Sequence, residues 1–283
     1  MTLTLRDAAI GVFDSGVGGL SVLRHIRAQL PHEDLIYVAD SGYAPYGDKT
    51  EQQVIDRSLA VAAYLVQQGV KALVVACNTA TVVAIRALRA RYPELPIVGV
   101  EPGLKPAAAA SHNGKIGVLA TERTVRGDKL LALREQVSAA TGATFILQPC
   151  IGLVERIEQC AVGDEPGDAT SAMLEHYIAP LLAQGVDTLV LGCTHYPFVQ
   201  DAITRTVLAH TQQAVTLIDT GDAVARQLAR LLDANGLRRD ANQAPQLHGY
   251  TTASVEALHT AFAGLLGWHP PLAQLSIQVE TEV

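Results

Sequence analysis

Two cysteines occupy equivalent positions in two segments of similar sequence. Cys77 and Cys193 each follow four mostly aliphatic residues and each precede a pair of polar residues. This pattern is typical of a buried strand that ends at the start of a helix. A thiol at a helix N-terminus has a lowered pKa, which raises the fraction of reactive thiolate. We therefore interpret both cysteines as candidates for proton transfer or nucleophilic chemistry.

The similarity extends to the residues before the cysteines. A helical run, a glycine and a short β-branched strand precede each one, and residues 10–13 (IGVF) resemble residues 116–119 (IGVL). The cysteines are separated by 193 − 77 = 116 residues and the other pair by 116 − 10 = 106. The sequence thus predicts an α/β fold with two similar parallel-sheet domains related by pseudo-two-fold symmetry. We expect the active site in the cleft between them, because parallel sheets bind ligands at the carboxyl ends of their strands.

The composition excludes several classes of protein. The chain has 283 residues, 49% of them hydrophobic, which is ample for one large or two modest α/β domains. A net charge of −7 argues against a nucleic-acid partner. No apolar run approaches the ~18 residues of a membrane span, and the N-terminus is too polar for a signal peptide. We expect a cytoplasmic protein with reduced cysteines and no membrane partner.

Breaks in the pattern predict where the chain passes between domains. Residues 101–106 contain three helix-breaking residues, and we place the first crossing there. The expected domains are residues 1–101 plus 215–283, carrying Cys77, and residues 102–214, carrying Cys193. Strands are predicted at 10–13, 35–39, 73–76, 97–100, 115–120, 144–147, 189–192 and 215–218. The main helices are predicted at 20–30, 51–68, 81–92, 125–140, 169–184, 198–210, 222–232 and 255–266, with a further helical segment around 151–160.

Two loops at predicted strand ends could bind a substrate. The loop that begins at Asp14 and Ser15 is rich in glycine and precedes a helix, so its N–H groups favour an anion. A dinucleotide is one alternative, but the sixth position of that fingerprint is not glycine, whereas a carboxylate suits the same loop. The second loop contains Tyr46 and Gly47, and a tight turn with a packed ring is the alternative there.

Paired thiols suit a reaction that removes a proton from one face of a carbon and delivers one to the other. A hydrolase would leave the second cysteine unexplained. The histidines lack the spacing of zinc ligands, and no lysine stands in a setting that favours a pyridoxal Schiff base, so we expect no metal and no cofactor. Cys150 and Cys160 are expected to be inert core residues.

Five motifs, in order along the chain, resemble those of the glutamate racemase family within the aspartate/glutamate racemase superfamily. They are Asp14–Leu20, Pro45–Gly47, Ala76–Ala80, Val100–Pro102 and Gly192–Pro197. The resemblance runs from about residue 10 to 230. It implies a cofactor-independent isomerase that interconverts L- and D-glutamate and supplies D-glutamate for peptidoglycan and the cell wall.

The resemblance also implies roles for single residues. Cys77 and Cys193 would be the two acid/base groups, assisted by Asp14 and His195. The residues implied in substrate binding are Asp14, Ser15, Tyr46, Gly47, Asn78, Thr79, Thr194 and His195, with Thr124 and Glu155 as further candidates. Glutamate is then the small-molecule partner, and a homodimer is the expected assembly.

Two alternatives remain open at this stage. The first is a related racemase or isomerase for aspartate, a hydantoin or another small dicarboxylate. Related aspartate racemases tend to carry glutamate after the second Cys-Thr, so His195 favours glutamate as substrate. The second alternative is a two-lobed amino-acid binding protein without catalysis, in which the cysteines are only packed.

Overall fold

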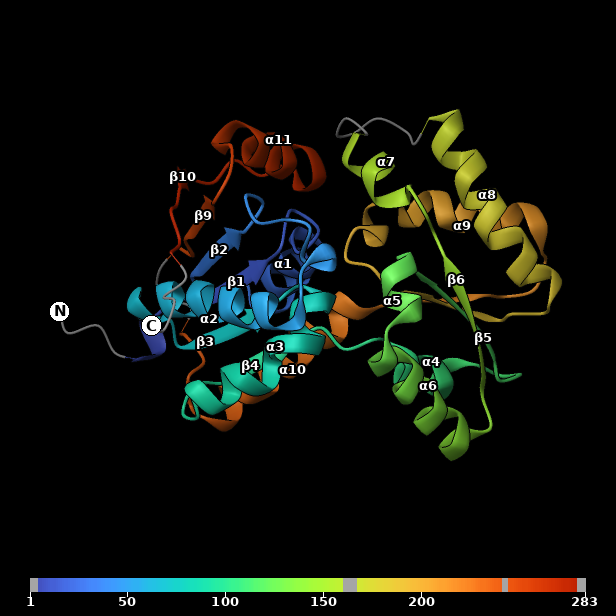
Figure 1. Cartoon of the computed structure of the whole chain (residues 1–283), viewed down its shortest axis with the longest axis horizontal. Coiled ribbons are helices and arrows are strands. Elements are labelled where there is room, and N and C mark those ends of the chain that lie inside the picture. The colour runs from blue at the N-terminus through green and yellow to red at the C-terminus, as the bar shows by residue number, and fades with distance from the viewer. Residues whose placement is uncertain (1–4, 160–166, 241–243, 279–283) are drawn as a thin grey trace. The chain divides into compact units, whose positions relative to one another are not determined.

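The computed structural model describes residues 5–159, 167–240 and 244–278, so the expectation for Cys160 lies outside the described residues. The chain divides into two compact units, Met1–Glu101 with Gly221–Val283, and Pro102–Thr220. The return to the first unit was predicted at residue 215 and comes six residues later. The reason is that the strand Thr216–Asp219 pairs with its neighbour in the second unit's sheet. Both units are drawn in Figure 1.

In the described part of the first unit, six parallel strands form one sheet in the order β10-β9-β2-β1-β3-β4. Their bounds are β1 (Ile10–Asp14), β2 (Leu35–Ala39), β3 (Ala72–Val75), β4 (Ile97–Gly99), β9 (Leu247–Thr251) and β10 (Leu272–Gln274). The helices are α1 (Leu20–Gln29), α2 (Glu51–Gln67), α3 (Asn78–Arg91), α10 (Thr220–Ala234) and α11 (Val255–Leu266), with 3-10 turns η1 (Leu5–Asp7) and η2 (Tyr46–Asp48).

Helices cover both faces of this sheet. Phe13, Leu73 and Val75 point to the face on which α2 and α3 pack and form one buried cluster. On the other face Tyr37 meets Phe262 of α11 edge to face, with ring centroids 5.7 Å apart. Strands buried on both faces read as continuous apolar runs, which is why the sequence predicted them.

The second unit has a four-stranded parallel sheet in the order β6-β5-β7-β8. Its strands are β5 (Lys115–Ala120), β6 (Thr144–Pro149), β7 (Thr188–Leu191) and β8 (Thr216–Asp219). Helices α4 and α6 share one apolar cluster with the sheet, and α7, α8 and α9 share another. The helices are α4 (Leu104–Ala110), α5 (Glu122–Arg126), α6 (Asp128–Thr141), α7 (Leu153–Gln159), α8 (Asp168–Ala183) and α9 (Gln200–His210), with the 3-10 turn η3 (Tyr196–Val199).

The two sheets repeat one plan. The order β2-β1-β3-β4 in the first unit has its counterpart in β6-β5-β7-β8 in the second. A Cβ on Gly11 would crowd the side chains of Leu65 and Val70. A Cβ on Gly117 would crowd Leu181 and Val186, the equivalent residues of the second unit. Equivalent glycines therefore let equivalent side chains pack directly against β1 in the first sheet and β5 in the second. The repeat predicted from the sequence is confirmed as a repeat of fold.

Several predicted element bounds were wrong for identifiable reasons. The two strands β9 and β10 were not predicted, because neither shows an apolar run longer than two residues. The predicted helix 125–140 is two helices, α5 and α6, separated at Gly127. Helix α3 begins three residues before its predicted start, because the Cys77 side chain caps it.

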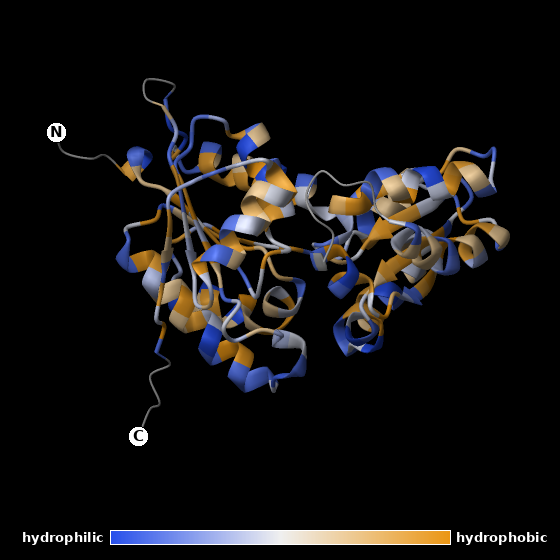
Figure 2. Ribbon diagram, turned by 90° about the horizontal axis from the view of Figure 1, so that it is seen from above, coloured by the Kyte–Doolittle hydropathy of each residue, from blue (hydrophilic) through white to orange (hydrophobic). Residues whose placement is uncertain are grey.

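The polarity of the helices matches these layers. Hydrophobic and hydrophilic residues alternate in bands around most helices (Figure 2), as expected for elements that are buried along one side. Among the helices of the described residues, none combines the length and apolar character that crossing a membrane requires.

Candidate functional site

The candidate residues lie where parallel strands end. Asp14 closes β1, Cys77 follows β3 after one residue, and Cys193 follows β7 after one residue. Because the strands of each sheet run in one direction, these side chains reach the carboxyl edge of their own sheet. Each unit therefore carries one half-site with one thiol.

The Cys77 half-site is buried and uncharged at the sulfur. Cys77 is 5% exposed and is the N-cap of α3, where its Sγ accepts a hydrogen bond of 3.5 Å from the N–H of Ala80. The thiol also lies 3.3 Å from the Ser15 hydroxyl. Burial, reinforced by the negative charge of Asp14, raises the pKa of Cys77 to about 12. At neutral pH this residue is a thiol that can donate a proton.

This result corrects the expectation of a lowered pKa at Cys77. The hydrogen bonds from Ser15 and Ala80 do lower the pKa, as a helix N-terminus should. Removal from water and the nearby carboxylate outweigh them. Sequence position alone indicates the donors but not the degree of burial.

Asp14 occupies the glycine-rich loop itself. Its Oδ2 accepts a hydrogen bond of 2.7 Å from the Gly19 N–H, at the start of α1. A Cβ at Gly19 would stand 2.7 Å from the Cβ of Asp14, so the close approach depends on glycine. The loop predicted to favour an anion thus already holds the protein's own carboxylate at this N–H.

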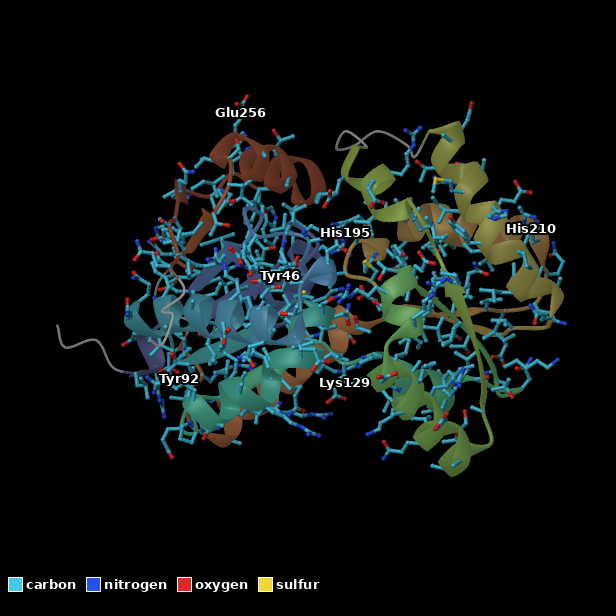
Figure 3. The ribbon with its side chains drawn as sticks, in the orientation of Figure 1. Tyr46, Tyr92, Lys129, His195, His210 and Glu256 are labelled. Carbon is cyan, nitrogen blue, oxygen red and sulfur yellow. The ribbon has the colours of Figure 1, made fainter. Side chains whose placement is uncertain are left out.

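The loop after β2 presents backbone, not a side chain. Tyr46 is 1% exposed, and its hydroxyl donates a 2.6 Å hydrogen bond to Asp40. Burial and that carboxylate raise the pKa of Tyr46 far above its usual value. Figure 3 labels this side chain within the first unit. A contact between Tyr46 or Gly47 and a substrate would therefore use their main-chain atoms.

The first turn of α3 supplies further donors. Asn78 and Thr79 are its first two residues and are half-buried. The N–H groups at these positions have no acceptor within their helix, because the preceding turn is missing. They lie directly after the thiol-bearing residue Cys77, so a carboxylate bound there would lie near the sulfur.

The Cys193 half-site has a different electrostatic character. The half-buried Cys193 places its Sγ 3.8 Å from Nδ1 of His195, and Nε2 of His195 lies 2.8 Å from Oε1 of Glu158. The His195 side chain is 12% exposed; it is labelled in Figure 3. Burial lowers the pKa of His195, but Cys193 and Glu158 more than offset this and raise it to about 10. At neutral pH His195 is an imidazolium.

Sequence reasoning did not single out Glu158. It named Glu155 as a candidate for substrate binding, and the exposed side chain of Glu155 lies in the first turn of the same helix, α7. Glu158, three residues later, contacts His195, and that hydrogen bond lowers the pKa of its carboxyl group. Two glutamates one turn apart were visible in the sequence. Only the orientation of α7 decides which one reaches the imidazole.

The remaining residues singled out from the sequence are the candidates Thr194 and Thr124, and Cys150, which was expected to be inert. Thr194 is 7% exposed and directly follows Cys193. Thr124 lies beyond the end of β5, where its hydroxyl is 2.9 Å from that of Thr121. Cys150 is 2% exposed and burial raises its pKa to about 12, which agrees with an inert core residue. Within 5–159, 167–240 and 244–278, no three His, Cys, Asp or Glu side chains gather in a way that could hold a metal ion.

Known proteins of one family resemble this chain over most of its length. Residues 10–228 match the family model described as Asp/Glu/Hydantoin racemase. A glutamate racemase from Pseudomonas aeruginosa is 52% identical over 235 residues, 83% of this chain and 85% of that protein. One from Ralstonia pickettii is 49% identical over 272 residues, 96% of this chain and 92% of that protein.

Solved structures agree. A glutamate racemase isoform from Bacillus anthracis has a TM-score of 0.84 at 30% identity and covers 97% of this chain and 100% of its own. The Escherichia coli glutamate racemase, solved with L-glutamate and the activator UDP-MurNAc-ala, has a TM-score of 0.78 at 32% identity, with 96% and 99% covered. The Francisella tularensis glutamate racemase, solved with D-glutamate, has a TM-score of 0.79 at 27% identity, with 96% and 98% covered.

Proposed function

The chain belongs to the Asp/Glu/Hydantoin racemase family, and we propose that it interconverts L- and D-glutamate by proton transfer between the alpha carbon and two thiols. The observation that carries the proposal is the equivalent placement of Cys77 and Cys193 at the carboxyl ends of β3 and β7. A racemase needs one group to remove a proton from the carbon and another to return one to the opposite face. Two half-sites with one thiol each supply that pair.

We assign the role of base in one direction to Cys193 and the role of acid to Cys77. Cys77, with a pKa of about 12, is a thiol at neutral pH, and Cys193 lies beside the His195 imidazolium. In one direction the Cys193 thiolate takes the alpha proton and becomes a thiol. The electron pair left on the carbon is delocalised into the adjacent carboxylate, and Cys77 then gives its proton to the other face.

The opposite direction requires Cys77 to become the base. The carboxylate of Asp14 is the charged group whose field acts on this thiol. We propose that Asp14 takes the proton from Cys77, while the His195 imidazolium gives its proton to Cys193 so that Cys193 can donate to the carbon. Each thiol therefore has its own assistant, and the two transfers leave the number of protons in the site unchanged.

Backbone donors suit glutamate as the ligand. The N–H groups of Asn78 and Thr79 lie in the first turn of α3 and those of Tyr46 and Gly47 in the 3-10 turn η2, and main-chain N–H groups at a helix start bind carboxylates well. The related proteins solved with L- and D-glutamate support the same substrate. We propose that the D-glutamate formed serves peptidoglycan synthesis.

The direct test is incubation of the dialysed protein with L-glutamate in D₂O. We expect circular dichroism to fall to zero as both enantiomers form, and mass spectrometry to show one deuterium at the alpha carbon. The same protein should act far more slowly on L-aspartate. Activity that appears only after pyridoxal phosphate or a divalent ion is added would contradict the thiol mechanism. Binding of L-glutamate without exchange would indicate a binding protein.

A further inference from the structure

A buried carboxylate lies behind the loop that carries Tyr46 and Gly47. Asp40 follows β2, is 0% exposed, and forms a two-bond ion pair with Arg57, of 2.8 Å to Nε and 2.6 Å to Nη2. It also accepts the hydroxyl of Tyr46 at 2.6 Å and that of Thr252 at 2.8 Å. Both carboxylate oxygens of Asp40 therefore accept hydrogen bonds from side chains of other segments.

One of those segments comes from far along the chain. Thr252 directly follows β9, and its hydroxyl accepts a 2.9 Å hydrogen bond from the Gly42 N–H while donating to Asp40. The Thr252 N–H donates to the carbonyl of Ala39 at 3.1 Å. A Cβ on Gly42 would stand 2.5 Å from the Thr252 carbonyl oxygen, so the two backbones touch.

Arg57 makes a second connection to the end of the chain. Its Nη1 donates a 2.7 Å hydrogen bond to the carbonyl of Ile277. The same guanidinium stacks over the ring of Tyr43, 5.0 Å from its centroid, and Tyr43 meets Tyr46 edge to face at 6.0 Å. The loop from Asp40 to Tyr46 is thereby connected to residues after 250 directly at Thr252 and, through Arg57, at Ile277.

We propose that residues 247–278, which carry no catalytic motif, position the Tyr46–Gly47 loop for substrate through Thr252, Asp40 and Arg57. These three are positioning residues, since none of them is required to touch the substrate. The effect on substrate rests on the function proposed above, in which the N–H groups of Tyr46 and Gly47 bind a carboxylate. The effect on the loop itself does not.

The physical reason is that Asp40 is completely buried. A buried charge tolerates no loss of a partner, because the partner's hydrogen bond replaces water that cannot enter. Removing the Thr252 hydroxyl leaves both Asp40 and the Gly42 N–H with one hydrogen bond fewer. The loop then moves to recover these bonds, and the N–H groups one turn away move with it.

The test compares three variants that differ by one or two atoms. Thr252→Val removes the hydroxyl at nearly constant volume, whereas Thr252→Ser keeps the hydroxyl and lacks only the methyl group. Ser254→Ala is the matched control, because Ser254 lies two residues away and its hydroxyl caps α11 at the N–H of Ala257 without reaching the loop. Hydrogen–deuterium exchange of residues 41–49 reports on the loop, and steady-state kinetics in both directions report on substrate.

We expect Thr252→Val to speed amide exchange of residues 41–49 and to raise KM for both enantiomers about tenfold, with kcat changed much less. Thr252→Ser should return both readings toward the parent, and Ser254→Ala should change neither. Unchanged exchange in Thr252→Val, or equal effects in Ser254→Ala, would overturn the proposal. Faster exchange with an unchanged KM would overturn the link to substrate. If the parent protein fails to racemise glutamate, the proposed function fails while the exchange result still decides the anchoring.

Discussion

Cys77 and Cys193 hold the same place in a repeated fold but have different neighbours. Cys77 is buried beside a serine hydroxyl and a carboxylate, and its pKa is raised to about 12. Cys193 lies beside an imidazole whose own pKa is raised to about 10 by its contacts with the thiol and Glu158. The repeated strands determine where the thiols are. The side chains that follow each strand determine which charges surround each thiol.

This difference has a functional consequence for a reaction with two faces. Burial and the negative charge of Asp14 keep Cys77 protonated, while the imidazolium of His195 lies beside Cys193. In the proposed mechanism Cys77 therefore acts as an acid in one direction and must first lose its proton to act as a base in the other.

The largest expected effect comes from removing either thiol. Cys77→Ser and Cys193→Ser should each lower racemisation by about 10⁴-fold or more, because an alcohol is a far weaker acid than a thiol. Each variant should still remove the alpha proton on its intact side. A glutamate analogue with a β leaving group should therefore undergo elimination, with Cys77→Ser accepting one enantiomer and Cys193→Ser the other.

The absorbance of the keto-acid product measures this elimination directly. Cys150→Ser is the control, since this buried cysteine lies outside the proposed chemistry. If both serine variants accept the same enantiomer, one cysteine is structural. If Cys150→Ser loses as much activity, packing and not proton transfer explains the losses.

A second prediction concerns the charge of Glu158. Glu158→Gln keeps a hydrogen-bond acceptor for His195 but removes the negative charge, so the pKa of His195 should fall from about 10 by about 1–3 units. NMR of ¹³C-labelled histidine, with His195→Asn to assign the signal, measures this titration. Glu155→Gln should leave it unchanged, because the side chain of Glu155 is exposed and Glu158 makes the contact.

The kinetic effect of Glu158→Gln should appear only in the half-reaction that uses Cys193. In the proposed mechanism the His195 imidazolium assists Cys193, so elimination in the Cys77→Ser background should slow at neutral pH. The deficit should disappear above about pH 10, where His195 is neutral in both proteins. A deficit that is constant with pH, or one that is equal in the Cys193→Ser background, would show that Glu158 acts only on folding.

The sequence was sufficient for the parts of the fold that depend on buried parallel strands. The runs around β3 and β7 are apolar throughout, and their similarity predicted both the repeat and the placement of Cys77 and Cys193. The strands β9 and β10 escaped prediction because they are short and mixed in polarity. Strand β9 pairs with β2 and strand β10 pairs with β9, and β2 is distant from both in sequence.

The electrostatics of the site could not be predicted in the same way. Whether Cys77 is acidic depends on how completely it is buried and on the distance to Asp14, and neither is a local property of the sequence. The selection of Glu158 over Glu155 depends on the orientation of α7 relative to η3. Motifs therefore pointed to candidate reacting atoms, while the protonation of Cys77 and the partner of His195 depend on tertiary packing.

The smallest expected effects are those of the hydroxyls of Thr79 and Thr194, which are proposed to bind substrate. Thr79→Val and Thr194→Val should each raise KM about 2- to 10-fold, the value of one neutral hydrogen bond of about 0.5–1.5 kcal/mol. Because such a bond holds the substrate in both directions, the ratio of the two kcat/KM values should not change.

Ser15→Ala is the informative contrast, since the Ser15 hydroxyl lies 3.3 Å from Cys77 and lowers its pKa. Its loss should raise that pKa further and slow the direction in which Cys77 is the base. Progress curves from each pure enantiomer give both ratios, and a direction-independent loss in Ser15→Ala would mean that this serine only binds substrate.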